Sequence, residues 1–167
     1  MLSSRHPNNL CRTVEIVERV LADHSRLCEL FACYQSTQEV VRLRGSNTTK
    51  RIANVESSVV VPFIDRLTKE MSELEQVFAQ WTLGALFRQL QNDMSAAQRS
   101  AAEIVMWRNP ALHRDWIFLN ETKQTLGQWA NKSPELAIWM TPHLERLSGD
   151  NRKSVAGKAK RWREQLG

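Results

Sequence analysis

The feature that most constrains this sequence is how rarely glycine and proline interrupt it. The 167 residues include six Gly and five Pro, and neither type occurs between Pro7 and Gly45. Because these residues mark turns and loops, their scarcity leaves long stretches that suit helices better than many short strands. With 42% apolar and 25% charged residues, the composition is that of a globular domain with its own core. We therefore expect an all-α fold.

A first apolar stripe predicts a long helix near the N-terminus. Apolar residues recur in alternating steps of three and four from Leu10 to Phe31, which is heptad spacing. His24 and Cys28 occupy positions on the same stripe. We therefore expect both side chains to face a core or a partner helix.

A second stripe of the same kind runs from Ile64 to Ala85 and predicts another long helix. Packed against each other, the helices near residues 10–31 and 63–90 would form a long antiparallel pair. The same stripes could instead meet across a dimer axis, because a stripe specifies what is buried and not which chain covers it.

Two less regular segments lie between the stripes. Residues 42–51, RLRGSNTTKR, contain four basic side chains, no acidic one and a central glycine, which predicts a surface connection. Residues 52–61 combine helical spacing with three consecutive valines that favour a strand, and propensity leaves both open. We interpret them as a helix that ends or kinks before Pro62.

Three local signals predict helix starts. The Ser-Ala-Ala-Gln segment 95–98 has the spacing of a capping box, in which each side chain bonds the other residue's amide. The Asn-Pro pair at 109–110 and the Ser-Pro pair at 133–134 each place a capping side chain before a proline. Proline suits the first helical position because that amide has no partner within the helix.

The chain ends in a basic amphipathic segment. After the SGDN turn at 148–151, a narrow apolar stripe runs among basic residues and comprises Val155, Ala159, Trp162 and Leu166. We expect a single-domain bundle of five to six helices over residues 1–149. Residues 150–167 form a basic C-terminal helix that is part of this domain or appended to it.

Positive charge concentrates in two segments of a chain whose formal net charge is +5. The eighteen residues from Asp150 hold six basic and two acidic side chains, and residues 42–51 hold four basic ones. Such clusters can contact phosphates, and Trp162 could stack on a base. The candidate nucleic-acid-binding residues are Arg42, Arg44, Lys50, Arg51, Arg152, Lys153, Lys158, Lys160, Arg161 and Arg163. The alternative is that the tail charges only keep a docked helix soluble.

The segment RNPALH, residues 108–113, carries the nearest thing to a catalytic motif. Arg-Asn followed by three residues and His resembles the R-x4-6-H motif of HEPN-domain ribonucleases, which are all-helical and often dimeric. The resemblance implies that Arg108 contacts the scissile phosphate and that His113 performs acid–base chemistry. The alternative, which the sequence favours, is that Asn109-Pro110 caps a new helix.

The sequence shows no motif for metal binding or for other kinds of catalysis. His24 and Cys28 could supply two metal ligands, but one helix cannot deliver the four that a structural zinc needs, so we expect no metal and no cofactor. The sequence contains no P-loop, nucleophile elbow or H-E-x-x-H pair.

Three cysteines cannot form a closed disulfide framework, which favours a reducing, cytoplasmic location. No run of eighteen apolar residues predicts a membrane span.

These observations favour a non-enzymatic helical subunit of a larger assembly that contacts the backbone of DNA or RNA through a basic loop and a basic tail. Protein partners, or a second copy, would bind its apolar stripes. Two alternatives remain: a metal-independent HEPN-like ribonuclease using Arg108 and His113, and a protein–protein adaptor that binds no nucleic acid.

Overall fold

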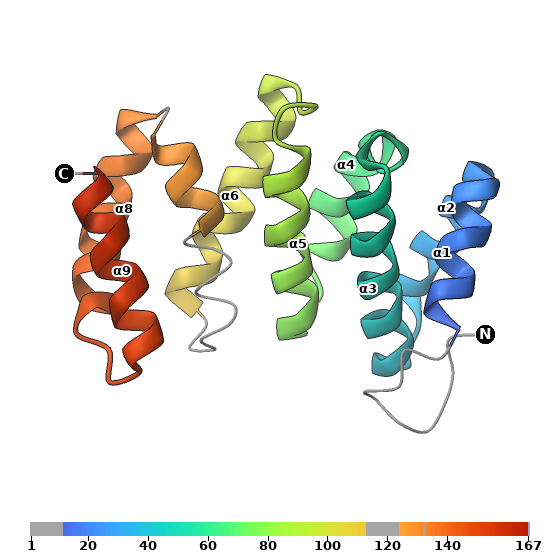
Figure 1. Ribbon diagram of the computed structural model, residues 1–167, viewed down its shortest axis with the longest axis horizontal. Helices are drawn as coiled ribbons and strands as arrows, with labels where there is room; N and C mark the ends of the chain where they lie inside the picture. The colour runs from blue at the N-terminus through green and yellow to red at the C-terminus, as the bar shows by residue number, and fades with distance from the viewer. Residues whose placement is uncertain (1–11, 113–123, 132, 167) are drawn as a thin grey trace. The chain divides into compact units, whose positions relative to one another are not determined.

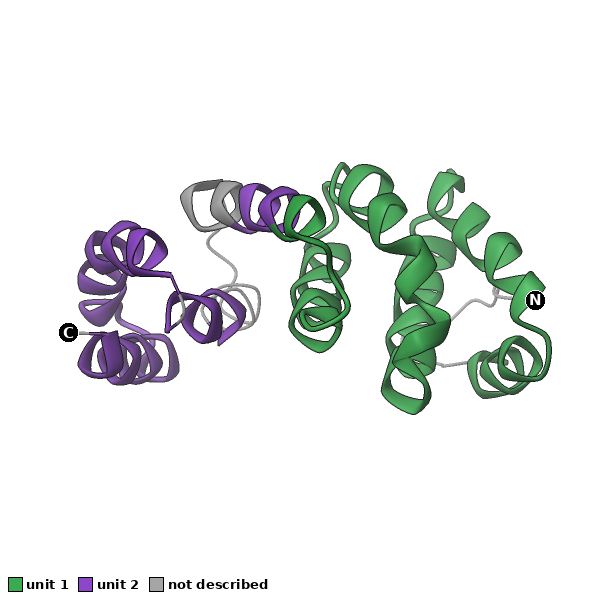
Figure 2. Cartoon of the chain, turned by 90° about the horizontal axis from the view of Figure 1, so that it is seen from above, with its two compact units in different colours: residues 1–99 green, residues 100–167 purple. Residues whose placement is uncertain are grey.

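The computed structural model describes the backbone of residues 12–112, 124–131 and 133–166, and the side chains of the same ranges except 107–112 (Figure 1). Within these ranges every regular element is helical and none is a strand, which confirms the all-α fold class. None of the described helices is long and apolar enough to cross a membrane. The chain divides into two compact units, Met1–Arg99 and Ser100–Gly167 (Figure 2).

Unit 1 begins with two short helices where one long helix was predicted. Helix α1 (Thr13–Ala22) is followed by the 3-10 turn η1 (His24–Arg26) and helix α2 (Leu27–Ala32). The break is at Asp23, whose backbone is extended and whose carboxylate accepts hydrogen bonds from the amide and hydroxyl of Ser25. This side chain offers the backbone an alternative to the helical pattern, so the chain turns.

The break overturns the predicted burial of part of the first stripe. His24 and Cys28 are exposed, so the prediction that they face a core of this chain was wrong, and the alternative that they face a partner helix stays a prediction. The buried apolar side chains of this region follow the two separate helices and are Val17, Val20, Leu27, Leu30 and Phe31. After Asp23 the chain no longer continues the register of α1, so the heptad pattern extended across the break misplaces His24 and Cys28, although it places Phe31 correctly.

Helix α3 (Glu39–Val55) replaces the surface connection predicted for residues 42–51, and that prediction was wrong. The helix packs against α1 and against α5 (Val77–Leu90), and its middle is buried. A Cβ added to the central Gly45 would lie 3.1 Å from the Cβ of Cys33, so the glycine permits close packing with the 3-10 turn η2 (Cys33–Gln35).

Local hydrogen bonds allow the polar residues of α3 to be buried. The hydroxyls of Ser46, Thr48 and Thr49 donate to carbonyl oxygens four residues earlier, at 2.7–3.0 Å. The hydroxyls of Thr49 and Tyr34 also lie 2.8 Å apart. Because a buried polar group is costly only when it lacks a partner, this polar segment can form the centre of a helical unit.

The segment after α3 contains short turns instead of a strand or a continuing helix. Helix α3 ends at Val55, seven residues before Pro62, and the 3-10 turns η3 (Ser57–Val59) and η4 (Val61–Phe63) follow. The structure thus answers the helix-or-strand question for residues 52–61: the first four are helical and the rest form turns.

The second predicted long helix is also interrupted. Helix α4 (Ile64–Arg66) continues into the π-helical turn η5 (Leu67–Met71), and α5 starts only at Val77. The side-chain amide of Gln80 donates to the carbonyl oxygens of Ser72 and Leu74, at 3.0 and 2.8 Å, and so stabilises the non-helical backbone between them. The long antiparallel pair and the count of five to six helices are not confirmed.

Helix α6 (Ala96–Leu112) starts with the predicted capping box, since Ser95 and Gln98 bond each other's amide at 3.0 and 3.2 Å. It continues through Asn109-Pro110, so the cap predicted there was wrong. Extending an existing helix is easier than nucleating a new one, and a proline in the final turn removes only one backbone hydrogen bond.

The rest of unit 2 contains a helix at 124–130, α8 (Pro134–Ser148) and α9 (Lys153–Leu166), with α8 and α9 packed together. The predicted cap at Ser133 is confirmed, because its hydroxyl accepts a hydrogen bond from the amide of Leu136. The predicted turn before the final helix is confirmed as well.

Candidate nucleic-acid interface

Helix α9 docks through the apolar stripe that the sequence predicted. Val155 and Ala159 are fully buried, and Trp162 and Leu166, two and three turns along, are half-buried. A single stripe in contact with the rest of unit 2 leaves the remaining faces of the helix to solvent. The charges of α9 are therefore carried on a firmly packed helix.

Trp162 anchors α9 against the helix at 124–130. Three atoms of its indole ring lie 2.5–2.7 Å from the point that a Cβ on Gly127 would occupy. Real Cβ contacts are longer than this, so only glycine at position 127 accommodates the ring at this depth. The ring thus packs inside unit 2, and stacking of the half-buried Trp162 on a base stays a prediction.

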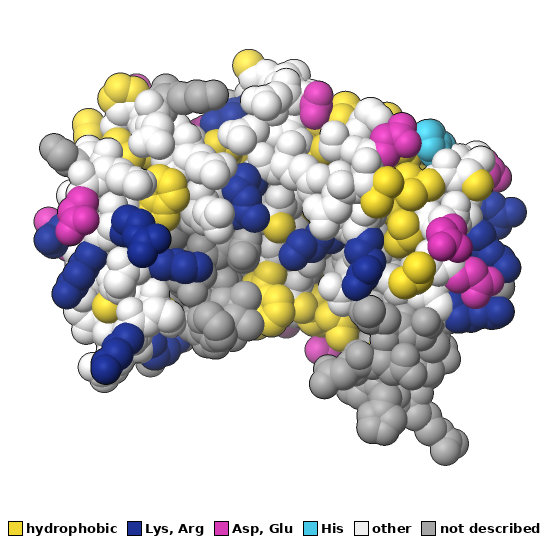
Figure 3. Space-filling model, viewed as in Figure 1, with side chains coloured by type: hydrophobic (Ala, Val, Ile, Leu, Met, Phe, Trp, Pro, Cys, Tyr) yellow, Lys and Arg dark blue, Asp and Glu magenta, His cyan; other side chains and the backbone are white. Residues whose placement is uncertain are grey.

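Five cations of α9 face solvent and are not paired with a carboxylate among the described residues. None of them forms an ion pair or hydrogen bond with another side chain in the part of the chain that the structure describes. These exposed residues are Lys153, Lys158, Lys160, Arg161 and Arg163. By helical spacing, Lys153, Lys160 and Arg161 point away from the buried stripe, whereas Lys158 and Arg163 flank it on opposite sides. Figure 3 shows dark blue side chains gathered over α9.

Arg152 differs from the other cations of the tail. Its guanidinium bonds both carboxylate oxygens of Asp150, with Nε–Oδ1 at 2.7 Å and Nη2–Oδ2 at 2.6 Å. Its backbone amide also donates to the same carboxylate, at 2.9 Å. This bidentate pair closes the turn before α9 and neutralises one of the six predicted tail contacts.

The four basic residues of α3 do not form one surface. Arg44 is only 1% exposed, and Arg42 is half-buried with its Nε 3.1 Å from Oε1 of Gln76 and its Nη1 2.5 Å from the carbonyl oxygen of Ser36. Only Lys50 and Arg51 of this set are exposed. The predicted basic loop is thus a helix with two arginines engaged inside unit 1 and two cations outside.

The residues of the ribonuclease-like motif are only partly described. The backbone of Arg108 lies in the last part of α6, and His113 lies outside the described residues. In unit 2, His143 is described: its ring contacts Trp139 with centroids 4.4 Å apart. Burial lowers the pKa of His143, and the nearby charge of Arg146 lowers it further, so its neutral form is favoured at pH 7.

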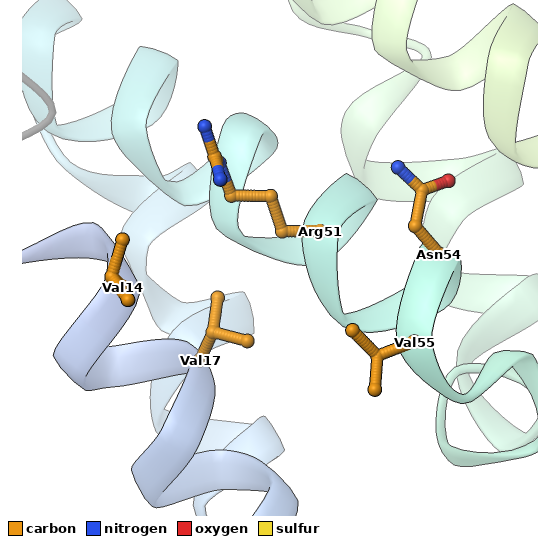
Figure 4. A pocket seen from close by; sticks show the side chains of 5 residues that line it. All are labelled: Val14, Val17, Arg51, Asn54 and Val55. Carbon is orange, nitrogen blue, oxygen red and sulfur yellow. The ribbon is translucent and has the colours of Figure 1, made fainter.

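The described residues contain no cluster of three or more His, Cys, Asp or Glu that could hold a metal ion. They do form a groove of about 220 Å³ between α1 and α3, which sequence reasoning missed. Figure 4 shows its lining, which comprises Val14, Val17, Arg51, Asn54 and Val55. The spacing of Arg51, Asn54 and Val55, one helical turn apart, could have indicated a shared face if α3 had been predicted as a helix.

Comparison with known proteins adds no relationship: no family, no curated protein and no solved structure matches this chain.

Proposed function

We propose that this protein is a non-enzymatic helical subunit that contacts the sugar-phosphate backbone of DNA or RNA through α9. One observation carries the proposal: five cations project from a docked helix, and no carboxylate among the described residues pairs with them. Cations that the protein does not neutralise are available to an external polyanion, and each phosphate that they neutralise releases counterions.

The arrangement of these cations supports sequence-tolerant binding. Contacts to phosphates position a protein on nucleic acid but do not read bases, and Trp162 is held by packing on Gly127. Five phosphate contacts would give a slope of roughly −4.5 in a plot of log affinity against log salt concentration, at about −0.9 per contact on duplex DNA. Both lysine and arginine suit phosphate, arginine through paired hydrogen bonds.

The decisive experiment removes the exposed charges of α9 without touching its buried stripe. In the α9 variant, four cations are changed to Gln: Lys153, Lys158, Lys160 and Arg161. We expect loss of measurable binding to fluorescein-labelled duplex DNA and single-stranded RNA at low salt, measured by fluorescence anisotropy. The circular dichroism spectrum should remain that of the wild type, because all four side chains are exposed.

A charge-matched control removes four exposed cations from unit 1, namely Arg12, Arg19, Arg26 and Lys69. This control has the same net charge as the α9 variant and should keep most of the wild-type affinity. An equal loss of affinity in both variants would mean that net charge alone drives binding to nucleic acid. Unchanged binding in the α9 variant would reject the proposal.

Membership of a larger assembly is part of the proposal and has its own test. A pull-down from native extract, with and without nuclease, separates protein partners or self-association from nucleic-acid bridging. Nuclease-sensitive recovery supports the proposal. A protein–protein adaptor would instead give three results. Partner proteins would still be recovered after nuclease treatment, Leu74→Asp would abolish this recovery, and the protein would not bind nucleic acid. The odd number of cysteines is our reason for proposing the cytoplasm as its location.

A ribonuclease is the second candidate, and the continuity of α6 favours it. Arg108 belongs to a regular helix and not to a cap, and in HEPN-domain ribonucleases the motif that this segment resembles tends to lie within a regular helix. This function requires RNA cleavage in the presence of a metal chelator and loss of that cleavage in His113→Ala. Intact RNA after prolonged incubation with concentrated wild-type protein would exclude it.

A further inference from the structure

The groove between α1 and α3 is a surface that the proposed nucleic-acid contact does not use. Two of its valines are strongly exposed, Val14 at 52% and Val55 at 68%, whereas Val17 is buried. Figure 4 shows the valines of α1 and the valine of α3 on opposite sides of the groove. When a partner covers apolar side chains that are exposed together in a concave site, the free energy of the system falls.

A cation lies beside these valines. Arg51 lines the same groove, and no ion pair joins it to a carboxylate within the described ranges. On α1, Glu15 is already bound by Arg12 and Arg19 at 2.7 and 2.6 Å. Asn54 adds an amide that can donate or accept a hydrogen bond. The groove therefore combines apolar walls with an uncompensated positive charge.

The size and chemistry of the groove select among possible occupants. About 220 Å³ is below the roughly 300–1,000 Å³ of small-molecule and cofactor pockets. A phosphodiester backbone would satisfy Arg51 but would leave the valines uncovered. A protein segment with an aliphatic side chain next to a carboxylate satisfies both, because burial of the apolar side chain also shields the ion pair from water.

We propose that this groove binds an acidic segment of a partner protein, with an aliphatic side chain between Val14 and Val55 and an Asp or Glu on Arg51. The affinity comes mainly from the covered apolar area, and the charge pair selects the partner. The inference is independent of the proposed nucleic-acid contact, because it uses different residues in the other unit.

The test uses a phage-displayed library of random peptides, selected on the full-length protein. We expect enriched peptides to pair Leu, Ile or Val with Asp or Glu, and a synthetic consensus peptide to lose about tenfold or more in affinity on Val55→Asp. Selection on Arg51→Glu should enrich Lys or Arg in place of the acidic residue, because the sign of the charge at the groove has been reversed.

Two matched controls separate the groove from general surface effects. Lys50→Glu makes the same charge change on the neighbouring exposed residue, which does not line the groove. Ile104→Asp places a carboxylate at another aliphatic residue, 52% exposed, in unit 2. Both should bind the consensus peptide within about twofold of wild type, as expected for positions outside the contact.

Several outcomes would overturn this inference. One is a selection that yields no consensus, or a consensus without an acidic residue. Another is a peptide affinity that Val55→Asp leaves unchanged while thermal melting shows both proteins folded. Sedimentation that shows a wild-type dimer and a monomeric Val55→Asp variant would instead make a second copy of this chain the occupant. Loss of nucleic-acid binding in the α9 variant would leave the inference unaffected.

Discussion

Helices α3 and α9 carry similar amounts of positive charge, but two of the basic side chains of α3 are drawn into the fold whereas those of α9 stay exposed. In α3, Arg42 and Arg44 are drawn into unit 1, where α1 and α5 pack on two sides of the helix. In α9 the cations stay outside, because one apolar stripe contacts the rest of unit 2. A cluster of basic residues therefore forms a surface only when the packing of its helix leaves that face uncovered.

The largest expected difference concerns burial. Arg44→Ala should reduce the free energy of unfolding by about 3 kcal/mol, because removing a side chain that is only 1% exposed leaves a cavity and loses its packing contacts. Lys160→Ala, on the exposed side of α9, should change it by less than about 0.5 kcal/mol. Urea denaturation of both variants measures the difference, and equal values would mean that the two helices are packed alike.

The second prediction compares two glycines of unit 2. Gly127→Ala should destabilise the protein by about 1–3 kcal/mol, because the new methyl group overlaps the indole of Trp162 and displaces α9. Gly157→Ala, where a Cβ meets nothing within 4 Å, should stabilise α9 by about 0.5–1 kcal/mol. Denaturation followed by tryptophan fluorescence should show these opposite signs. The same sign in both would refute the docking of Trp162 on Gly127.

A third prediction compares two arginines that form defined hydrogen bonds. Arg42→Lys should cost about 1 kcal/mol, because lysine cannot bond both Gln76 and the carbonyl of Ser36 with the same geometry. Arg152→Lys should cost about 0.5 kcal/mol or less, since the Arg152 side chain in its pair with Asp150 is 40% exposed. Thermal melts at two salt concentrations check this. The melting temperature of the Arg152 variant should depend more strongly on salt than that of the Arg42 variant. A larger cost at Arg152 would contradict the comparison.

The smallest expected effects concern single exposed lysines and depend on the proposed nucleic-acid contact. Lys160→Gln should reduce the magnitude of the salt slope of binding by about one, and Lys50→Gln should leave it unchanged. Neither substitution should move the free energy of unfolding by more than about 0.5 kcal/mol, because both side chains are exposed. Anisotropy titrations across a salt series distinguish the two, and an equal change would assign both helices to the interface.

Local signals were predicted well from the sequence. The capping box at 95–98, the cap at Ser133 and the stripe of α9 each depend on residues within one or two helical turns, and the structure confirms all three. Side chains that interrupt a helix by forming hydrogen bonds with the backbone were not recognised from the sequence. Asp23 bonds Ser25 and ends α1, and Gln80 bonds carbonyls of the segment before α5, although neither residue is a glycine or proline.

The candidate surfaces were predicted less completely. The exposure of Lys153, Lys158, Lys160, Arg161 and Arg163 follows from the stripe of α9 alone. The groove at Arg51 and Val55 needed the pairing of α1 with α3, which connects residues far apart in the sequence. The sequence pattern does not state which helices meet.

By itself the sequence determined the all-helical class, the caps that start α6 and α8, and the division of α9 into an apolar stripe and a cationic remainder. The reason is that these features arise from neighbours along one helix. Only the tertiary structure decided that Arg44 is buried while Lys160 is not, that Trp162 rests on Gly127, and that two exposed valines share a groove with Arg51. Burial is a property of what packs on a residue, and the packing partners come from distant parts of the chain.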